Sequence, residues 1–396
     1  MAIEIRTPTE DHWLELVAVD ARAFGWVPNE KEIAQRRPLM DLTRFRIAVD
    51  RGRIVAVVGS FALDMTLPGR ATIPASGTTW VSVSATHRRQ GILTRLMAAL
   101  HADADDRGEP VSALFASEGG IYRRFGYGVA TTTQRVTIAR AAATLSSDLA
   151  VTPGAVRYAT PDEARDHHPA VWERARRERP GQVSRGAAWE EFTFVQYAES
   201  QDGMTPAFHL VHDDGYAVYR IEQGWGPIPS HTLQLVELVT DTTQARIDLW
   251  HALLGVDLVG KINSSILPPD EPLKYWLTNP RAYQVTAAYD GLWVRPNDVA
   301  IAFGARTYGT VDRLVVEVDG KRWAIESDGA EASCKAVRSK PDMVTEQGAL
   351  GALLLGAVSP TELAAGRRLE ARNDAALHRA DAFFASRPLA HCSNHF

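Results

Sequence analysis

One stretch near residue 90 combines residues that can hold a phosphate group. A segment that we expect to form a strand, Thr78–Val83, precedes the basic turn His87–Gly91, after which apolar residues recur at helical spacing. A turn rich in backbone N–H groups at the start of a helix binds anions. Arg88 and Arg89 add bidentate donors for phosphate, and Gly91 lets the backbone approach a ligand closely. The spacing therefore predicts a phosphate site, although a surface turn with two solvated arginines has the same residues.

A second segment, Ala116–Gly128, carries two tyrosines among its glycines. A phenol hydroxyl can donate a proton to a departing thiolate, so Tyr122 is a candidate general acid. Tyr127 is the rival candidate, since it offers the same chemistry. Both tyrosines could equally cap a core with their hydroxyl groups hydrogen-bonded, which is a structural role.

The elements that must position these segments alternate between strands and helices. Two apolar runs, Phe45–Val49 and Ile54–Phe61, flank a Gly-containing turn and predict a β-hairpin. A further strand is expected at Val111–Ala116, with the helix that starts at Ile92 before it. A similar order of hairpin, strand and helix recurs over 208–254, but its turn Thr240–Thr243 has neither Arg nor Gly. We therefore expect a second lobe of related topology without the basic turn.

The sequence of the last part of the chain predicts a further segment that contains both strands and helices. Leu314–Val318 and Trp323–Ser327 flank an Asp-Gly pair, which indicates a hairpin. The boundary before this segment is expected near Thr286–Gly291. Helices are expected at Met343–Ala357, Pro360–Ala365 and Ala375–Ala385.

Composition narrows the function classes. The 396 residues are 45% hydrophobic and 23% charged, which is typical of a globular protein. With 43 basic and 48 acidic residues the net charge is −5, so broad binding of nucleic acid is not expected. Two cysteines, Cys334 and Cys392, and no Cys/His spacing of a zinc site argue against disulfides and metal. Without an apolar leader or spanning segment, we expect no membrane attachment and a cytoplasmic location.

The basic turn resembles the acetyl-CoA loop of the GCN5-related N-acetyltransferases. Its order, Arg88-x-x-Gly91-x-Leu93, approximates the Arg/Gln-x-x-Gly-x-Gly/Ala pattern of that superfamily and departs from it at Leu93. In that pattern the loop wraps a pyrophosphate, and the preceding strand splays from its neighbour to admit a pantetheine arm.

Taken together, Val81–Gly91 and Ala116–Gly128 resemble the Eis family, named for mycobacterial enhanced intracellular survival. Other similar stretches are Pro8–Asp11 with Trp13, Asp214–Arg220, Asp290–Arg295 and the final Phe396. The resemblance covers the whole chain and implies an α+β fold in three parts. These are an acetyltransferase lobe over residues 1–145, a second lobe of the same type without its own cofactor over 146–286, and a domain like sterol carrier proteins over 287–396.

The resemblance also implies the groups that do the chemistry. Acetyl-CoA is the expected donor, and no metal is expected. The implied general acid is Tyr122 rather than Tyr127, and the implied general base is the main-chain carboxylate of Phe396. By matched position, the implied cofactor-binding residues are Val81, Ser82, Val83, Arg88, Arg89, Gln90, Gly91, Ile92, Leu93, Thr94, Ser117 and Glu118.

The implied acceptor is an aminoglycoside, acetylated by direct transfer at several amines, and the implied assembly is a homohexamer. The substrate-binding residues expected on this basis are Trp13, Phe24, Trp26, Trp80 and His395.

Departures from the family pattern predict a less acidic substrate pocket. The family has an acid just before its terminal Phe, where this chain has His395, and another two residues after Phe24, where it has Trp26. Arg36 and Arg37 stand where the family has a Trp-Arg pair. A protein lysine or a metabolite amine is therefore an alternative acceptor, and a non-catalytic protein that binds acyl-CoA or lipid is a further alternative.

Overall fold

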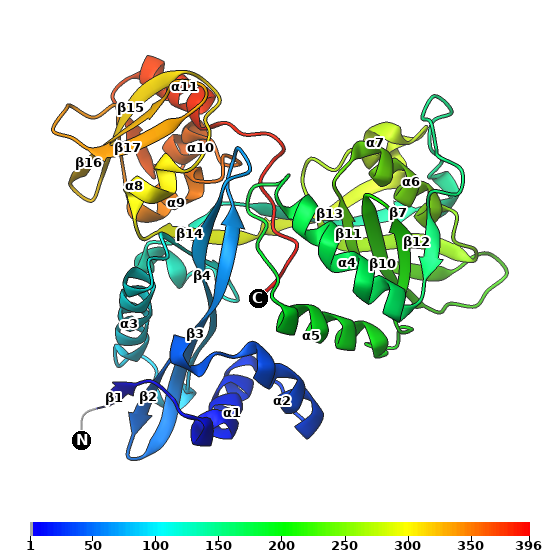
Figure 1. Ribbon diagram of the computed structural model, residues 1–396, viewed down its shortest axis with the longest axis horizontal. Helices are drawn as coiled ribbons and strands as arrows, with labels where there is room; N and C mark the ends of the chain where they lie inside the picture. The colour runs from blue at the N-terminus through cyan, green and yellow to red at the C-terminus, as the bar shows by residue number, and fades with distance from the viewer. Residues whose placement is uncertain (1–2) are drawn as a thin grey trace. The chain divides into compact units, whose positions relative to one another are not determined.

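The computed structural model describes residues 3–396, which form two compact units. Unit 1 comprises the chain up to Ala130, Leu292–Ser386 and Asn394–Phe396, and unit 2 comprises Thr131–Gly291 and Arg387–Ser393. In the colouring of Figure 1, unit 1 therefore contains both the blue-to-cyan start of the chain and its yellow-to-red end.

Unit 1 contains a seven-stranded sheet of order β1-β2-β3-β4-β5-β14-β6. Neighbouring strands are antiparallel except β4 and β5, which are parallel and connected through a helix. The strands are β1 (Glu4–Arg6), β2 (Phe45–Asp50), β3 (Arg53–Thr66), β4 (Thr72–Val83), β5 (Val111–Phe115), β14 (Leu292–Pro296) and β6 (Gly128–Val129).

Two helices cover opposite faces of this sheet, on either side of β3 in Figure 1. Phe45 and Ile47 of β2 pack with α1 (Trp13–Phe24), whereas Ala48 packs with α3 (Ile92–Asp106). Because side chains alternate between the two faces of a strand, one apolar strand serves both cores. The smaller helices of this region are η1 (Glu10–His12), α2 (Glu30–Arg36), η2 (Arg37–Leu39), η3 (Leu42–Arg44), η4 (Ala85–His87) and η5 (Tyr122–Phe125).

Unit 1 also contains a five-stranded sheet of order β17-β16-β15-β18-β19. The buried guanidinium of Arg306 donates hydrogen bonds to the carbonyl groups of Leu353 (2.8 Å) and Phe384 (2.9 Å), which ties the helices of this part together. The elements are α8 (Val299–Gly304), β15 (Asp312–Val318), β16 (Lys321–Ser327), β17 (Ala332–Ala336), β18 (Met343–Thr345), α9 (Gln347–Leu353), α10 (Pro360–Ala365), β19 (Leu369–Ala371) and α11 (Asp374–Phe384).

Glycines allow α9 to lie directly on the first sheet. A Cβ atom at Gly128 would stand 1.8 Å from the carbonyl oxygen of Gly348, and one at Gly351 would stand 2.1 Å from that of Val294. Backbone meets backbone at both places, so no side chain can rotate away to make room. The two sheets of unit 1 are therefore joined by close main-chain packing.

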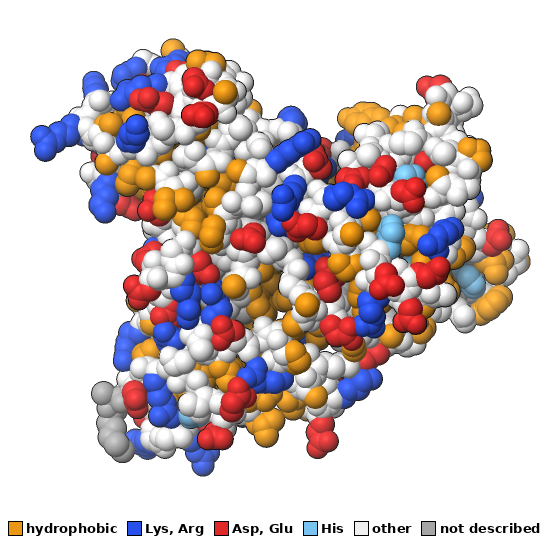
Figure 2. All heavy atoms as spheres, viewed as in Figure 1, with side chains coloured by type: hydrophobic (Ala, Val, Ile, Leu, Met, Phe, Trp, Pro, Cys, Tyr) orange, Lys and Arg blue, Asp and Glu red, His pale blue; other side chains and the backbone are white. Residues whose placement is uncertain are grey.

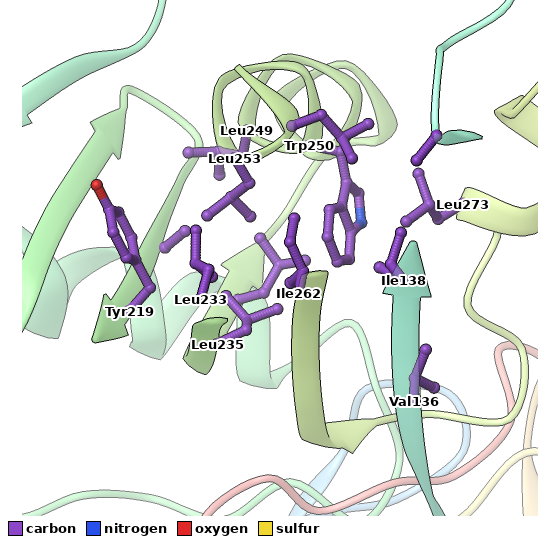
Figure 3. Packing of buried hydrophobic residues seen from close by; sticks show 14 of the residues in the cluster. Val136, Ile138, Tyr219, Leu233, Leu235, Leu249, Trp250, Leu253, Ile262 and Leu273 are labelled. Atoms are coloured by element: carbon purple, nitrogen blue, oxygen red, sulfur yellow. The ribbon is translucent and has the colours of Figure 1, made fainter. Parts of the chain in front are cut away.

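Unit 2 contains a seven-stranded sheet of order β13-β7-β12-β11-β10-β9-β8 with α6 and α4 packed on its core clusters. Figure 3 shows Trp250 of α6 directed between Ile138, Ile262 and Leu273. The elements are β7 (Thr132–Ala139), η6 (Arg140–Ala142), β8 (Arg157–Ala159), α4 (Pro161–Arg176), α5 (Ala187–Ala198), β9 (Phe208–His212), β10 (Gly215–Glu222), β11 (His231–Thr240), α6 (Thr243–Leu254), β12 (Val259–Leu267), α7 (Leu273–Trp276), η7 (Pro280–Ala282) and β13 (Tyr283–Asp290).

Both units contain the predicted order of hairpin, strand and helix. In unit 1, α3 connects the parallel strands β4 and β5, and in unit 2, α6 connects the parallel strands β11 and β12. Each connection is preceded by an antiparallel hairpin, β2–β3 or β9–β10.

Two segments differ from the sequence expectation. Leu292–Pro296, expected in the last domain, pairs with Val111–Phe115 and lies between β5 and β6 of the first sheet. The expected helix Met343–Ala357 is wrong at its start, because Met343–Thr345 pairs with β15 as a strand and the helix α9 begins only at Gln347. In both cases partners distant in sequence decide the conformation.

The visible face in Figure 2 carries Lys and Arg side chains interspersed with Asp and Glu side chains. No helix within residues 3–396 is both long and apolar enough to cross a membrane.

Gly128→Ala should destabilise unit 1, because its methyl group cannot avoid the Gly348 carbonyl oxygen. We expect a loss of about 3 kcal/mol in the free energy of unfolding, seen as a lower Tm by calorimetry. Gly186→Ala is the control, since a Cβ atom there meets nothing within 4 Å. Equal melting temperatures for the two variants would contradict the main-chain contact.

Candidate active site

Strands β4 and β5 separate part-way along their length, and the site begins at this opening. Their pairing stops at Gly77 and Ala113, although β4 continues to Val83. Beyond this point β4 has a bulge at Trp80, whose φ of 53° is rare for a large side chain. The edge of β4 that faces away from β3 is therefore not paired with β5 from Thr78 onward, which leaves room for a narrow ligand.

The helix α3 begins near this opening without a side-chain cap. Its N-cap residue, Gly91, adopts a left-handed φ of 74°, and no described side chain caps the helix. Arg88 and Arg89 are exposed beside it. The turn is held to the sheet, because the Ser84 N–H donates a hydrogen bond to the Val55 carbonyl (2.8 Å). Available backbone donors and two guanidinium groups at a helix N-terminus suit a phosphate ligand.

The corresponding turn of unit 2 has internal partners instead. The Thr242 hydroxyl accepts a hydrogen bond from the Ala245 N–H (3.2 Å) and caps α6. In the first turn of α6, Arg246 forms an ion pair with the fully buried Glu271. That carboxylate also accepts a hydrogen bond from the Trp250 indole (3.0 Å). The hydrogen-bond donors at this turn that a phosphate ligand would need are thus already bonded to groups of unit 2 itself.

A cavity of about 230 Å³ in unit 1 lies against the open part of β4. Both predicted catalytic residues, Tyr122 and Phe396, contribute to its wall. The lining residues are Asp20, Phe24, Thr78, Thr79, Trp80, Val81, Phe115, Ser117, Tyr122 and Phe396.

The two tyrosines have different surroundings. Tyr127 is fully buried, and its hydroxyl is hydrogen-bonded to Thr78 Oγ1 (2.9 Å) and His101 Nε2 (3.2 Å). Burial raises the pKa of Tyr127 to about 12. Burial also raises the pKa of Tyr122, against the opposing effect of the Ser117 hydroxyl, so the phenol stays protonated near neutral pH. Only Tyr122 lines the cavity and can donate its proton there.

The ring of Phe396 is packed against other rings of unit 1. It meets Phe61 and Phe115 edge-on, with centroid distances of 6.5 and 5.4 Å. Gly77 leaves space for the ring, because a Cβ atom there would lie 3.1 Å from Phe396 Cε2. The last residue is therefore held at the cavity by its side chain.

The predicted cofactor residues lie on β4, on the turn after it and in α3, except Ser117 and Glu118, which follow β5. Val81 and Ser117 line the cavity, Ser82 is buried, and Val83 ends β4. The exposed ones are Arg88, Arg89, Gln90, Gly91, Thr94 and Glu118, whereas Leu93 is half-buried and Ile92 is in the core.

Among the predicted substrate-binding residues, those that line the cavity are Phe24 and Trp80. Trp13 is buried next to Trp80, with 5.7 Å between ring centroids. His395 stacks on the cavity residue Phe115 at 4.0 Å. Trp26 packs at the edge of the core around α1. These three residues support the wall of the cavity from outside its lining.

Sequence reasoning missed the lining residues Thr78, Thr79 and Phe115, and also the acidic residue Asp20. It lies on the buried face of α1 one turn after Val17, and only 7% of it is exposed. Burial raises the pKa of Asp20 to about 6, against the effects of the Ser82 hydroxyl, the charge of Arg36 and the Trp26 indole. A carboxylate on the apolar face of an amphipathic helix is the sequence signal that identifies it.

The site's residues fit acetyl-CoA. The uncapped start of α3 with Arg88 and Arg89 suits a pyrophosphate, and the open edge of β4 suits a pantetheine arm that ends at the cavity. A Cβ atom at Gly91 would meet nothing within 4 Å, so the approach to this backbone is free. Across residues 3–396, no cluster of His, Cys, Asp and Glu is arranged to hold a metal ion.

Comparison with family models covers all three parts of the chain. Residues 4–130 and residues 181–296 each match an acetyltransferase (GNAT) domain, and residues 299–393 match a sterol carrier protein domain. The expected α+β fold, with two acetyltransferase lobes and a sterol-carrier-like domain, is confirmed.

Relatives match over nearly the full chain. N-acetyltransferase Eis of Mycobacterium bovis is 34% identical over 98% of both chains, and an uncharacterized N-acetyltransferase of Streptomyces avermitilis is 32% identical over 98% of both. The crystal structure of Eis1 from Mycobacterium abscessus has a TM-score of 0.90 and 29% identity, covering 99% of this chain and 100% of that one. The protein is thus an N-acetyltransferase with the acetyl-CoA-dependent GNAT domain, and it belongs to the Eis family.

Proposed function

We propose that this enzyme transfers the acetyl group of acetyl-CoA directly to amines of an aminoglycoside-type substrate, at one or several positions. The observation that carries the proposal is the convergence of Tyr122 and Phe396 on one cavity beside the open edge of β4. Direct transfer needs an acid for the leaving sulfur and a base for the attacking nitrogen. In this proposal Tyr122 is the acid and the main-chain carboxylate of Phe396 is the base.

Each residue then has one role in the reaction. Acetyl-CoA supplies an activated acetyl group. The Phe396 carboxylate accepts a proton from the acceptor ammonium, which frees the nitrogen lone pair to form the new C–N bond. Backbone N–H groups of β4 near Val83 polarise the thioester carbonyl. Tyr122 donates a proton to the sulfur as the C–S bond breaks. The nitrogen loses two protons in all; one balances the new thiol and the other passes to water.

The aminoglycoside acceptor is proposed from the family resemblance, and a homohexamer is proposed on the same ground. The hydroxyl group of Thr79 at the cavity is consistent with a hydroxyl-rich acceptor. A hydroxyl can exchange hydrogen bonds with sugar hydroxyls as both donor and acceptor.

A small monoamine is the second candidate acceptor, and Arg36 favours it. The guanidinium of Arg36 lies 5.1 Å from the Trp26 ring, and its charge acts on the cavity residue Asp20. This cation opposes the approach of a polycation more than that of a single ammonium, whereas the neighbouring Arg37 is ion-paired with Glu10.

One screen separates these functions. Release of the CoA thiol is measured with aminoglycosides, monoamines and lysine peptides, and mass spectrometry counts the acetyl groups added. No release with any acceptor would instead support a protein that binds acyl-CoA or lipid without turnover.

Arg89→Ala should raise the KM for acetyl-CoA about 10-fold, because a charged donor to phosphate is lost. The KM for the amine should stay near that of the wild type in steady-state kinetics. Arg53→Ala removes another exposed arginine of the same unit and serves as the control. Equal effects on both substrates, or none, would argue against a phosphate site at this turn.

Tyr122→Phe should lower kcat about 100-fold in a well-folded protein, since the acid for the leaving sulfur is removed. Tyr127→Phe should keep kcat but lower the Tm, because its hydroxyl bonds to Thr78 and His101 are lost. Kinetics and thermal melting of both variants make the comparison. The reverse pattern would show that the acid is Tyr127.

One Gly added after Phe396 should lower kcat about 100-fold, because the carboxylate becomes an amide that cannot accept the proton. Binding of acetyl-CoA, measured by calorimetry, should not change. Deletion of Phe396 moves the carboxylate by one residue and removes the packed ring, so partial activity is expected. Wild-type turnover by the extended enzyme would exclude the terminal carboxylate as the base.

A further inference from the structure

Asp20 is a buried charged group at the cavity with incomplete hydrogen bonding. Its side chain projects from the buried face of α1, and 7% of the residue is exposed. The Oδ1 atom has no hydrogen-bond partner among the described residues. Buried polar atoms are normally satisfied, and an unsatisfied carboxylate oxygen costs free energy. Ser82, Trp26 and Arg36 act on the carboxylate, and Asp20 also lines the cavity, so a cation bound there would be a further partner.

The other lining residues point to the charge of that partner. Asp20 is the one acidic side chain among them; the rest are aromatic, hydroxyl-bearing or aliphatic. Phe24, Trp80, Phe115 and Phe396 contribute rings. Aromatic faces attract cations and exclude water, and a carboxylate in such surroundings pairs strongly with a cation. The combination suits an ammonium group attached to an apolar body.

We propose that Asp20 binds and orients the ammonium of the acceptor amine, and that it favours the second candidate acceptor, a monoamine with an apolar or aromatic body, over the aminoglycoside class. This assignment rests on the proposed direct transfer of the acetyl group to an amine at this cavity. It gives the acceptor nitrogen a fixed position at the same cavity as Tyr122 and Phe396. Release of its proton remains the role of Phe396, so Asp20 acts in binding.

A purely structural role for Asp20 predicts a different outcome, which follows from its neighbours. Arg36, Ser82 and Trp26 favour its ionised form, and burial opposes it. If these groups were its whole purpose, removing the charge would lower stability and leave the affinity for amines unchanged. If Asp20 serves the ligand, neutralising it should leave the protein at least as stable at pH 8, because a buried charge is removed.

The test compares Asp20→Asn with Asp106→Asn, which removes an exposed acid at the end of α3. Tryptamine represents an aromatic monoamine and kanamycin A a polyamine. We expect the tryptamine KM of Asp20→Asn to rise about 100-fold with an unchanged KM for acetyl-CoA. Calorimetry with the CoA-bound enzyme should show the same loss of tryptamine affinity, and the Tm at pH 8 should not fall. The control should match the wild type.

The proposal is overturned if Asp20→Asn has a KM and an affinity for tryptamine within twofold of those of the wild type. It is also overturned if the wild type does not bind tryptamine. A wild type that turns over only kanamycin A would overturn the monoamine class. If no amine is acetylated at all, the proposed function fails, and calorimetry still decides on Asp20: tryptamine binding that depends on it supports the cation site, and binding without it refutes the site.

Discussion

The separation of β4 from β5 beyond Gly77 is the feature on which the site depends. Parallel strands that remain paired leave no space between their edges and no unpaired backbone groups. Here the bulge at Trp80 redirects β4, and the cavity lies along the released part of the strand. Because α3 follows β4 after a short turn, its uncapped N-terminus belongs to the same region of unit 1. The Tyr127–Thr78 hydrogen bond fixes the wall of the opening from the core.

The position of Phe396 depends on packing over a long sequence distance. Its ring rests on β4 at Gly77 and between Phe61 and Phe115. The preceding segment is anchored within unit 2, where the His391 N–H donates a hydrogen bond to the Pro180 carbonyl (2.9 Å). The end of the chain is therefore fixed by specific contacts, which is what a catalytic role for its carboxylate requires.

Asp20 illustrates how a binding site can oppose stability. Its carboxylate lies among apolar residues of α1 and raises the free energy of the folded state when ionised. Such a residue persists where function requires it, since the penalty is removed when a cation binds. The same argument does not apply to Glu271 of unit 2, which is equally buried but fully engaged with Arg246 and Trp250. Burial alone therefore does not mark a ligand site.

Local pattern by itself determined much of this protein. The periodicity of Ile92, Leu96 and Leu100 defined α3, and the Asp-Gly turn at Asp319 defined the β15–β16 hairpin. The Arg-rich turn ending at Gly91 predicted an anion site at the start of α3, because all of the donors that it would use come from consecutive residues.

Only the tertiary structure decided the rest. Partners distant in sequence determine that Leu292–Pro296 pairs with β5 and that Met343–Thr345 forms a strand. They also determine that Tyr122 lines the cavity whereas Tyr127 lies in the core. From the sequence, Asp20 is one acid on a helix and Phe396 is the last residue. The sequence does not show that both line one cavity beside β4, nor that Asp20 Oδ1 has no hydrogen-bond partner among the described residues. These properties arise from which surfaces are buried together, and short-range spacing carries no information about that choice.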